Sequence, residues 1–155
     1  MKFVFDPALQ GTWVAQHLFP ATPGMAGLVK AAASAGCSVF GLTGRSAGQQ
    51  ADTIANLTEK GYVDAANKPL FTPAHYFTKG TVAVANSNAS IPTQPWVDCG
   101  GDNACSTIEY KSGTRAHIED QGYNIVGNFG DQYSDLIGGF SDHAYKLPNA
   151  TYYLP

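Results

Sequence analysis

The first group of residues suited to chemistry follows an apolar run at 37–42. Thr43, Gly44 and Arg45 come directly after it, and a helix is predicted next. A hydroxyl, a glycine that lets the backbone approach closely and the N–H groups of a helix start can together hold an anion. The same residues are also typical of a plain turn with a helix N-cap. The sequence alone leaves both interpretations open.

A second group follows another apolar run, at 124–129. Asp131 and Asp135 are four residues apart, a spacing that stacks two carboxylates on one face of a helix. Such a pair repels unless a cation lies between the two groups. Mg²⁺ fits, because it prefers one or two carboxylates together with waters and substrate phosphate. The alternative is an N-cap aspartate followed by a solvated one.

Lys111 lies between these two groups, in the segment IEYKSGTR. A single lysine is most often a surface residue. We expect this one to precede a glycine-containing turn into a helix that faces the same edge of the sheet. One ammonium group there would neutralise a phosphate and a neighbouring carboxylate.

The elements that must position these residues alternate between helices and apolar strands. Apolar spacing predicts helices at 23–36, 47–60 and 108–121, with a short one from 133. It also predicts buried strands at 37–42 and 124–129 and a last strand at 144–147. The stretch 69–96 reads as a long excursion with one strand-like segment at 81–85. This order indicates an α/β fold with a mostly parallel sheet. Ligands bind where parallel strands end, so the polar residues at both strand ends should meet.

The cysteines give a hint about compartment. Cys99 and Cys105 flank a short glycine-containing loop, and a disulfide between them is the preferred interpretation, with two free thiols as the alternative. Their spacing does not fit a zinc site. Cys37 is expected to be a buried small hydrophobe. A disulfide would imply an oxidising compartment.

Length and composition limit the classes of function. The chain has 155 residues, the size of one domain, with 14% charged residues and a formal net charge of −3. This balance argues against nucleic acid as the main partner, but it permits a small phosphorylated substrate. No apolar run approaches the length of a membrane span, and the first residues do not read as a signal peptide.

The order of these groups resembles the haloacid dehalogenase-like (HAD) phosphatases. Thr43 in VFGLTGR resembles the second motif of that superfamily, Lys111 its third, and Asp131 with Asp135 in GNFGDQYSD its fourth. The segments LTGR, IEYKSGTR and KLPNATYYLP are similar to the secreted, class B-like acid phosphatases of the superfamily. The resemblance covers about residues 19–155.

The resemblance implies a Rossmann-like three-layer α/β sandwich and Mg²⁺-dependent hydrolysis of phosphomonoesters through an aspartyl-phosphate. Thr43 would bind a phosphoryl oxygen, and Lys111 would offset charge between nucleophile and phosphate. Asp131 would hold Mg²⁺ with Asp135 in support. Gly44 and Arg45 would lie at the substrate phosphate, although Arg45 could equally be structural.

The first motif of the superfamily, Asp-x-Asp at the end of the central strand, is not found here. Asp6 is a poor candidate, because Ala8 replaces the second aspartate and Pro7 lacks the N–H that should face phosphate. We therefore expect residues 1–155 to be one HAD-like domain truncated before that motif. On this view 1–22 is a remnant of the cap or insert region, and the chain as given is inactive.

Two further expectations follow from the truncation. The full-length protein would be secreted, or lie in the periplasm or cell envelope. The alternative to an enzyme is an inactive phosphate-binding or storage-type relative. A receiver-like or nucleotide-binding domain is disfavoured, because no Gly-x-Gly-x-x-Gly or P-loop follows a strand.

Overall fold

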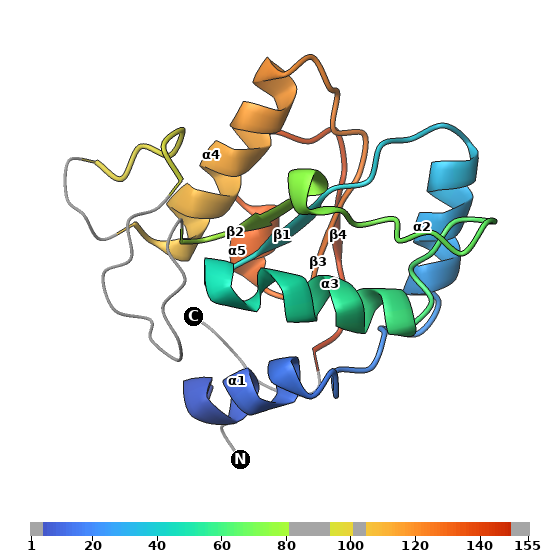
Figure 1. Ribbon diagram of the computed structural model, residues 1–155. Coiled ribbons are helices and arrows are strands. Elements are labelled where there is room, and N and C mark those ends of the chain that lie inside the picture. The colour runs from blue at the N-terminus through green and yellow to red at the C-terminus, as the bar shows by residue number, and fades with distance from the viewer. Residues whose placement is uncertain (1–4, 81–93, 101–104, 150–155) are drawn as a thin grey trace.

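The computed structural model describes residues 5–80, 94–100 and 105–149 (Figure 1). Short parallel strands alternate with helices, in the α/β manner expected from the sequence. None of the helices in these ranges is long and apolar enough to cross a membrane. In chain order the elements are α1 Pro7–Ala15, α2 Met25–Ser34, β1 Gly41–Thr43, a 3₁₀ helix Ala47–Gln49, α3 Gln50–Glu59, a 3₁₀ helix Pro73–His75, β2 Tyr76–Thr78, α4 Thr107–Asp120, β3 Asn128–Gly130, α5 Tyr133–Leu136 and β4 Ala144–Lys146.

The strands form two separate parallel pairs. β1 pairs with β2, with Thr43 opposite Thr78, and β3 pairs with β4, with Gly130 opposite Lys146. Within the described residues each strand has one partner strand. Each of these strands therefore has one edge without a strand neighbour in the described part of the chain.

The helices form where the apolar spacing predicts them. α2, α3 and α4 match the three expected helices, and glycines with positive φ follow each of them at Gly36, Gly61 and Gly122. α4 begins with a capping box, in which the Ser106 side chain accepts from the Glu109 N–H and the Glu109 side chain accepts from the Ser106 N–H.

The turn expected after Lys111 is absent, and that prediction was wrong. α4 runs without a break through Gly113. A side chain on Gly113 would lie 3.5 Å from the Val97 side chain. The 94–100 segment therefore packs against the helix at a distance where a methyl group on residue 113 would make an ordinary van der Waals contact. Lys111 consequently sits on a continuous helix.

A small aromatic cluster forms the core beside β1. Tyr62, Phe71 and Tyr76 are buried, and Met25, Val29, Ile54 and Leu57 are among the apolar residues packed against them. Gly41 makes this possible, because a Cβ there would fall 2.2 Å from the Tyr76 ring. The glycine therefore allows β1 and β2 to pair over the cluster.

The strands are shorter and more exposed than predicted. Cys37 is exposed, so its expected burial was wrong, and Val126 and Phe129 are 56% and 40% exposed. These residues come from the runs 37–42 and 124–129, which border a space between the two pairs of strands. β2 was not predicted, and the strand-like segment at 81–85 lies outside the described residues.

Candidate active site

One cleft collects the hydroxyl, glycine, cationic and carboxylate residues that the sequence places at the strand ends and at Lys111. It has a volume of about 1,510 Å³ and lies between the two pairs of strands, lined by the segments 37–46 and 123–132. The cleft is therefore bordered by β1 and β3, together with the residues that follow each strand. The lining includes Thr43, Gly44, Arg45, Lys111, Asp131 and Asp135.

The end of β1 provides a hydroxyl and a glycine. The Thr43 Oγ1 accepts a hydrogen bond from the Arg45 N–H at 3.3 Å, which closes a tight turn after the strand. The Arg45 guanidinium donates to the Thr53 Oγ1 at 2.9 Å and lies 4.8 Å from the centre of the Phe19 ring. These contacts give Arg45 a structural part in joining β1 to α3.

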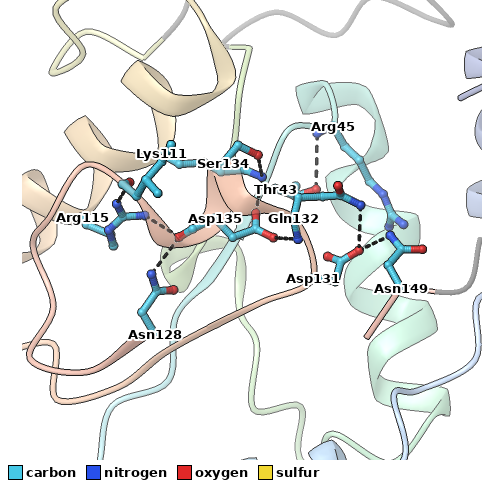
Figure 2. Close-up of polar contacts among 11 residues, drawn as sticks. Thr43, Arg45, Lys111, Arg115, Asn128, Asp131, Gln132, Ser134, Asp135 and Asn149 are labelled. Carbon is cyan, nitrogen blue, oxygen red and sulfur yellow. Dashed lines mark hydrogen bonds and ion pairs between the residues drawn. The ribbon is translucent and has the colours of Figure 1, made fainter. Parts of the chain in front are cut away.

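Lys111 projects from α4 toward the residues that follow β3 (Figure 2). It is 6% exposed and forms an ion pair with Asp135, and it also donates to the Ser134 Oγ at 3.4 Å. The other Asp135 oxygen accepts from the Gln132 N–H at 2.8 Å. Both carboxylate oxygens of Asp135 are thus engaged, one by a cation and one by the backbone.

Arg115 holds the segment that carries Asp135, and the sequence analysis did not identify it. The side chain is 2% exposed and donates to three backbone carbonyls, of Asp135 at 2.8 Å, Ile137 at 2.6 Å and Gly139 at 2.8 Å. Asn128 adds a fourth bond, to the Asp135 carbonyl at 2.7 Å. Burial lowers the Arg115 pKa, and the negative charges of Asp135 and Glu119 oppose that shift. The spacing in the sequence shows only that Arg115 lies one helical turn after Lys111, on the same face of α4.

Asp131 has a different environment from Asp135. It lies before α5, and Gln132 is the N-cap of that helix, so the prediction that both aspartates stack on one helix face was wrong. The Asp131 Oδ2 accepts from the Gln132 Nε2 at 3.3 Å and from the Asn149 Nδ2 (Figure 2). Asp131 forms no salt bridge within the described residues.

These differences decide how the residues would suit a divalent cation. The Asp131 carboxylate accepts its described hydrogen bonds from neutral side-chain amides. It could therefore bind Mg²⁺, which needs only one or two carboxylates together with waters. Asp135 is already neutralised by Lys111. No group of three or more His, Cys, Asp or Glu side chains gathers in the described ranges, so a cage made only of such groups is not present there.

Cys99 and Cys105 are joined by a disulfide in the structure, with Cα atoms 4.7 Å apart. Cys105 directly precedes the N-cap of α4 and lines the cleft. The disulfide therefore ties the start of the helix that carries Lys111 and Arg115 to the segment before it.

Comparisons with known proteins identify a matching family model and several similar proteins. A family model described as "HAD superfamily, subfamily IIIB (Acid phosphatase)" matches residues 2–90 and 93–155. The chain is 32% identical over 152 residues to a stem 28 kDa glycoprotein of Glycine max, covering 97% of this chain and 50% of that protein. It is 31% identical over 152 residues to acid phosphatase 1 of Solanum lycopersicum, covering 97% and 49%.

A solved structure shares the fold. The class C acid phosphatase of Bacillus anthracis aligns with a TM-score of 0.62 at 19% identity, covering 96% of this chain and 57% of that one. The likeness supports the HAD-like α/β fold expected from the sequence. The chain spans about half the length of the curated relatives that it matches.

Proposed function

This chain belongs to the acid phosphatase family of the HAD superfamily, subfamily IIIB, and we propose that it forms the phosphate-binding and metal-binding part of a Mg²⁺-dependent phosphomonoester hydrolase. One observation carries the proposal. The hydroxyl, the lysine and the two aspartates come from segments far apart in sequence, yet all line one cleft at the ends of parallel strands.

Each residue has a role that its surroundings favour. Thr43 donates a hydrogen bond from its hydroxyl group to a phosphoryl oxygen, and Gly44 lets the backbone approach the phosphate. Lys111, held by Asp135, places one positive charge beside the bound phosphate in a partly dehydrated cleft, where electrostatic stabilisation is strong. Arg115 keeps the Asp135 segment in place through its bonds to the backbone carbonyls.

Asp131 would hold the metal ion. Its amide neighbours, Gln132 and Asn149, orient the carboxylate without neutralising it. Asp135 supports this position through its bond to the Gln132 N–H. Bound there, Mg²⁺ would offset negative charge on the phosphoryl oxygens.

We propose that the nucleophile, an aspartate, lies on a strand outside the printed sequence. Support comes from the cleft, which β1 borders on one side and β3 on the other, each with a strand partner on its far side. A strand entering this space would place its last residues beside Thr43 and Lys111. As the carboxylate attacks phosphorus, the ester P–O bond would break, and the second aspartate of the Asp-x-Asp motif would give a proton to the oxygen of the leaving alcohol. Water would then release phosphate from the aspartyl-phosphate.

We also propose a domain organisation and a cellular compartment for the protein. Residues 1–155 would form most of one HAD-like domain, with 1–22, which include α1, belonging to its cap or insert region. Asp6 caps α1 by accepting from the Ala8 and Leu9 N–H groups, an arrangement that suits a structural residue and not a nucleophile. The disulfide supports secretion or residence in the periplasm or cell envelope.

The test compares two purified forms with p-nitrophenyl phosphate and Mg²⁺. One is the printed chain, and the other carries an added N-terminal strand ending in Asp-x-Asp. We expect hydrolysis only in the extended form, and we expect its first aspartate changed to asparagine to abolish it. Hydrolysis by the printed chain that Asp6→Asn removes would show that Asp6 is the nucleophile and would overturn the proposal.

A second candidate is a relative that binds phosphate without turnover. The described cleft favours this candidate because a hydroxyl, a lysine and a carboxylate that forms no described salt bridge all line it. The printed sequence contains no Asp-x-Asp motif. Phosphate binding by both forms, combined with no turnover by either, would favour this candidate.

A further inference from the structure

A second lysine lies at the rim of the cleft, in a place that no motif assigns. Lys79 directly follows β2, which runs parallel to β1 with Thr78 opposite Thr43. The Lys79 N–H donates to the Arg45 carbonyl at 3.0 Å, so the backbone is fixed beside the turn that holds Thr43. Its half-buried side chain lines the same cleft as Lys111.

The start of α4 adds to the positive character of this corner. Thr107, the first residue of that helix, lines the cleft, and a side chain on Gly44 would lie 4.0 Å from its methyl group. The N-terminus of a 14-residue helix carries a partial positive charge. Two lysines and a helix N-terminus therefore border the turn at 43–45.

The charged groups near this corner act in both directions. Burial lowers the Lys79 pKa, the positive charge of Lys111 lowers it further, and the negative charge of Glu109 acts in the opposite direction. Glu109 is exposed, and its carboxylate accepts from the Ser106 N–H at 2.7 Å in the capping box. Lys111 is paired with Asp135 on its other side.

We propose that Lys79 is a second phosphate-binding cation, which contacts the oxygens of the phosphate dianion opposite Lys111. The inference rests on the proposed function of the cleft and extends it. A dianion between the two ammonium groups would relieve their repulsion, whereas a singly charged anion would do so less completely. The ligand class is therefore a dianionic phosphate, either the free ion or the head of a monoester.

The experiment measures binding of inorganic phosphate to the 155-residue chain by isothermal titration calorimetry. The variants are Lys79→Gln, Lys79→Arg and Lys111→Gln, with Lys68→Gln as the matched control. Lys68 is exposed and does not line the cleft. Near-UV circular dichroism establishes that each variant keeps its packing.

We expect Lys79→Gln to weaken phosphate binding roughly tenfold, the effect of losing one charged hydrogen bond. Lys79→Arg should retain affinity within about threefold, because the charge remains. Lys68→Gln should bind like the parent chain.

Three results would overturn the inference. If Lys111→Gln weakens binding and Lys79→Gln matches Lys68→Gln, Lys79 has no part in the site and the proposed function stands. If Lys79→Arg loses as much affinity as Lys79→Gln, the charge is not what matters. If the parent chain does not bind phosphate at all, the proposed function of the cleft fails and the inference fails with it.

Discussion

At the scale of single residues, the site depends on a glycine that leaves room for the Asp135 side chain. Gly130 ends β3, and a Cβ built on it would lie 2.1 Å from the Asp135 Cβ. No neighbour could yield that much without moving the backbone. The carboxylate that neutralises Lys111 therefore reaches its place only because residue 130 has no side chain.

Gly130→Ala should destabilise the chain by about 1–3 kcal/mol, because the new methyl group must push Asp135 away from Lys111. Gly27→Ala is the matched control. Gly27 lies inside α2 with nothing near its Cβ position, so alanine should stabilise by about 0.5–1 kcal/mol through helix propensity. Urea unfolding measures both, and equal midpoints for the two variants would contradict the steric argument.

At the scale of elements, the sequence predicted where helices form better than where strands lie. The helical stripes at 23–36, 47–60 and 108–121 each gave a helix, because their spacing and terminal glycines act locally. Strand pairing depends on residues far apart in the sequence. The unpredicted β2 pairs with β1 across an intervening helix, and the runs at 37–42 and 124–129 form only three-residue strands.

The candidate site was predicted in its strand-end residues and missed in its supporting ones. Thr43, Asp131 and Asp135 stood out because hydroxyl and carboxylate groups follow apolar runs, and Lys111 stood out because it lies between these groups before a predicted turn into a helix. Arg115 did not stand out, since its partners are backbone carbonyls, which any sequence can provide. Such contacts become visible only when the loop after α5 is folded against α4.

Arg115→Lys should release that loop, because a lysine has no planar fork to reach three carbonyls at once. We expect a loss of about 2 kcal/mol in unfolding free energy, from buried carbonyls left without donors. Hydrogen–deuterium exchange should accelerate at residues 135–139, while α3 keeps its protection. Unchanged exchange in the loop would show that Arg115 is not its main anchor.

At the scale of the whole molecule, the two strand pairs lie on either side of the cleft. α3 lies against β2 and α4 against β1, so the β1–β2 pair has helices beside it (Figure 1). The β3–β4 side exposes more apolar surface, including Val126, Phe129 and Tyr145. Unpaired edges beside apolar side chains are templates for pairing with another chain.

The printed chain should therefore associate with itself as its concentration rises, which sedimentation velocity detects. Val126→Lys should reduce that association, because a charge beside β3 opposes edge-to-edge pairing. Leu9→Lys is the control, since Leu9 is exposed to a similar degree on α1 but does not line the cleft. If both substitutions reduce association equally, general surface apolarity and not the strand edge is responsible.

The buried amide of Asn56 has a consequence for carbohydrate attachment. Asn56-Leu57-Thr58 is a glycosylation acceptor sequence, yet Asn56 is 4% exposed. Its side chain donates to the Phe19 carbonyl at 3.0 Å and accepts from the Phe19 N–H at 3.1 Å. Because the side chain is buried against the segment around Phe19, a sugar on this nitrogen has no room in the folded structure. In a cell that modifies such sequences, a glycan at Asn56 would mark molecules that were modified before α3 docked on the segment around Phe19.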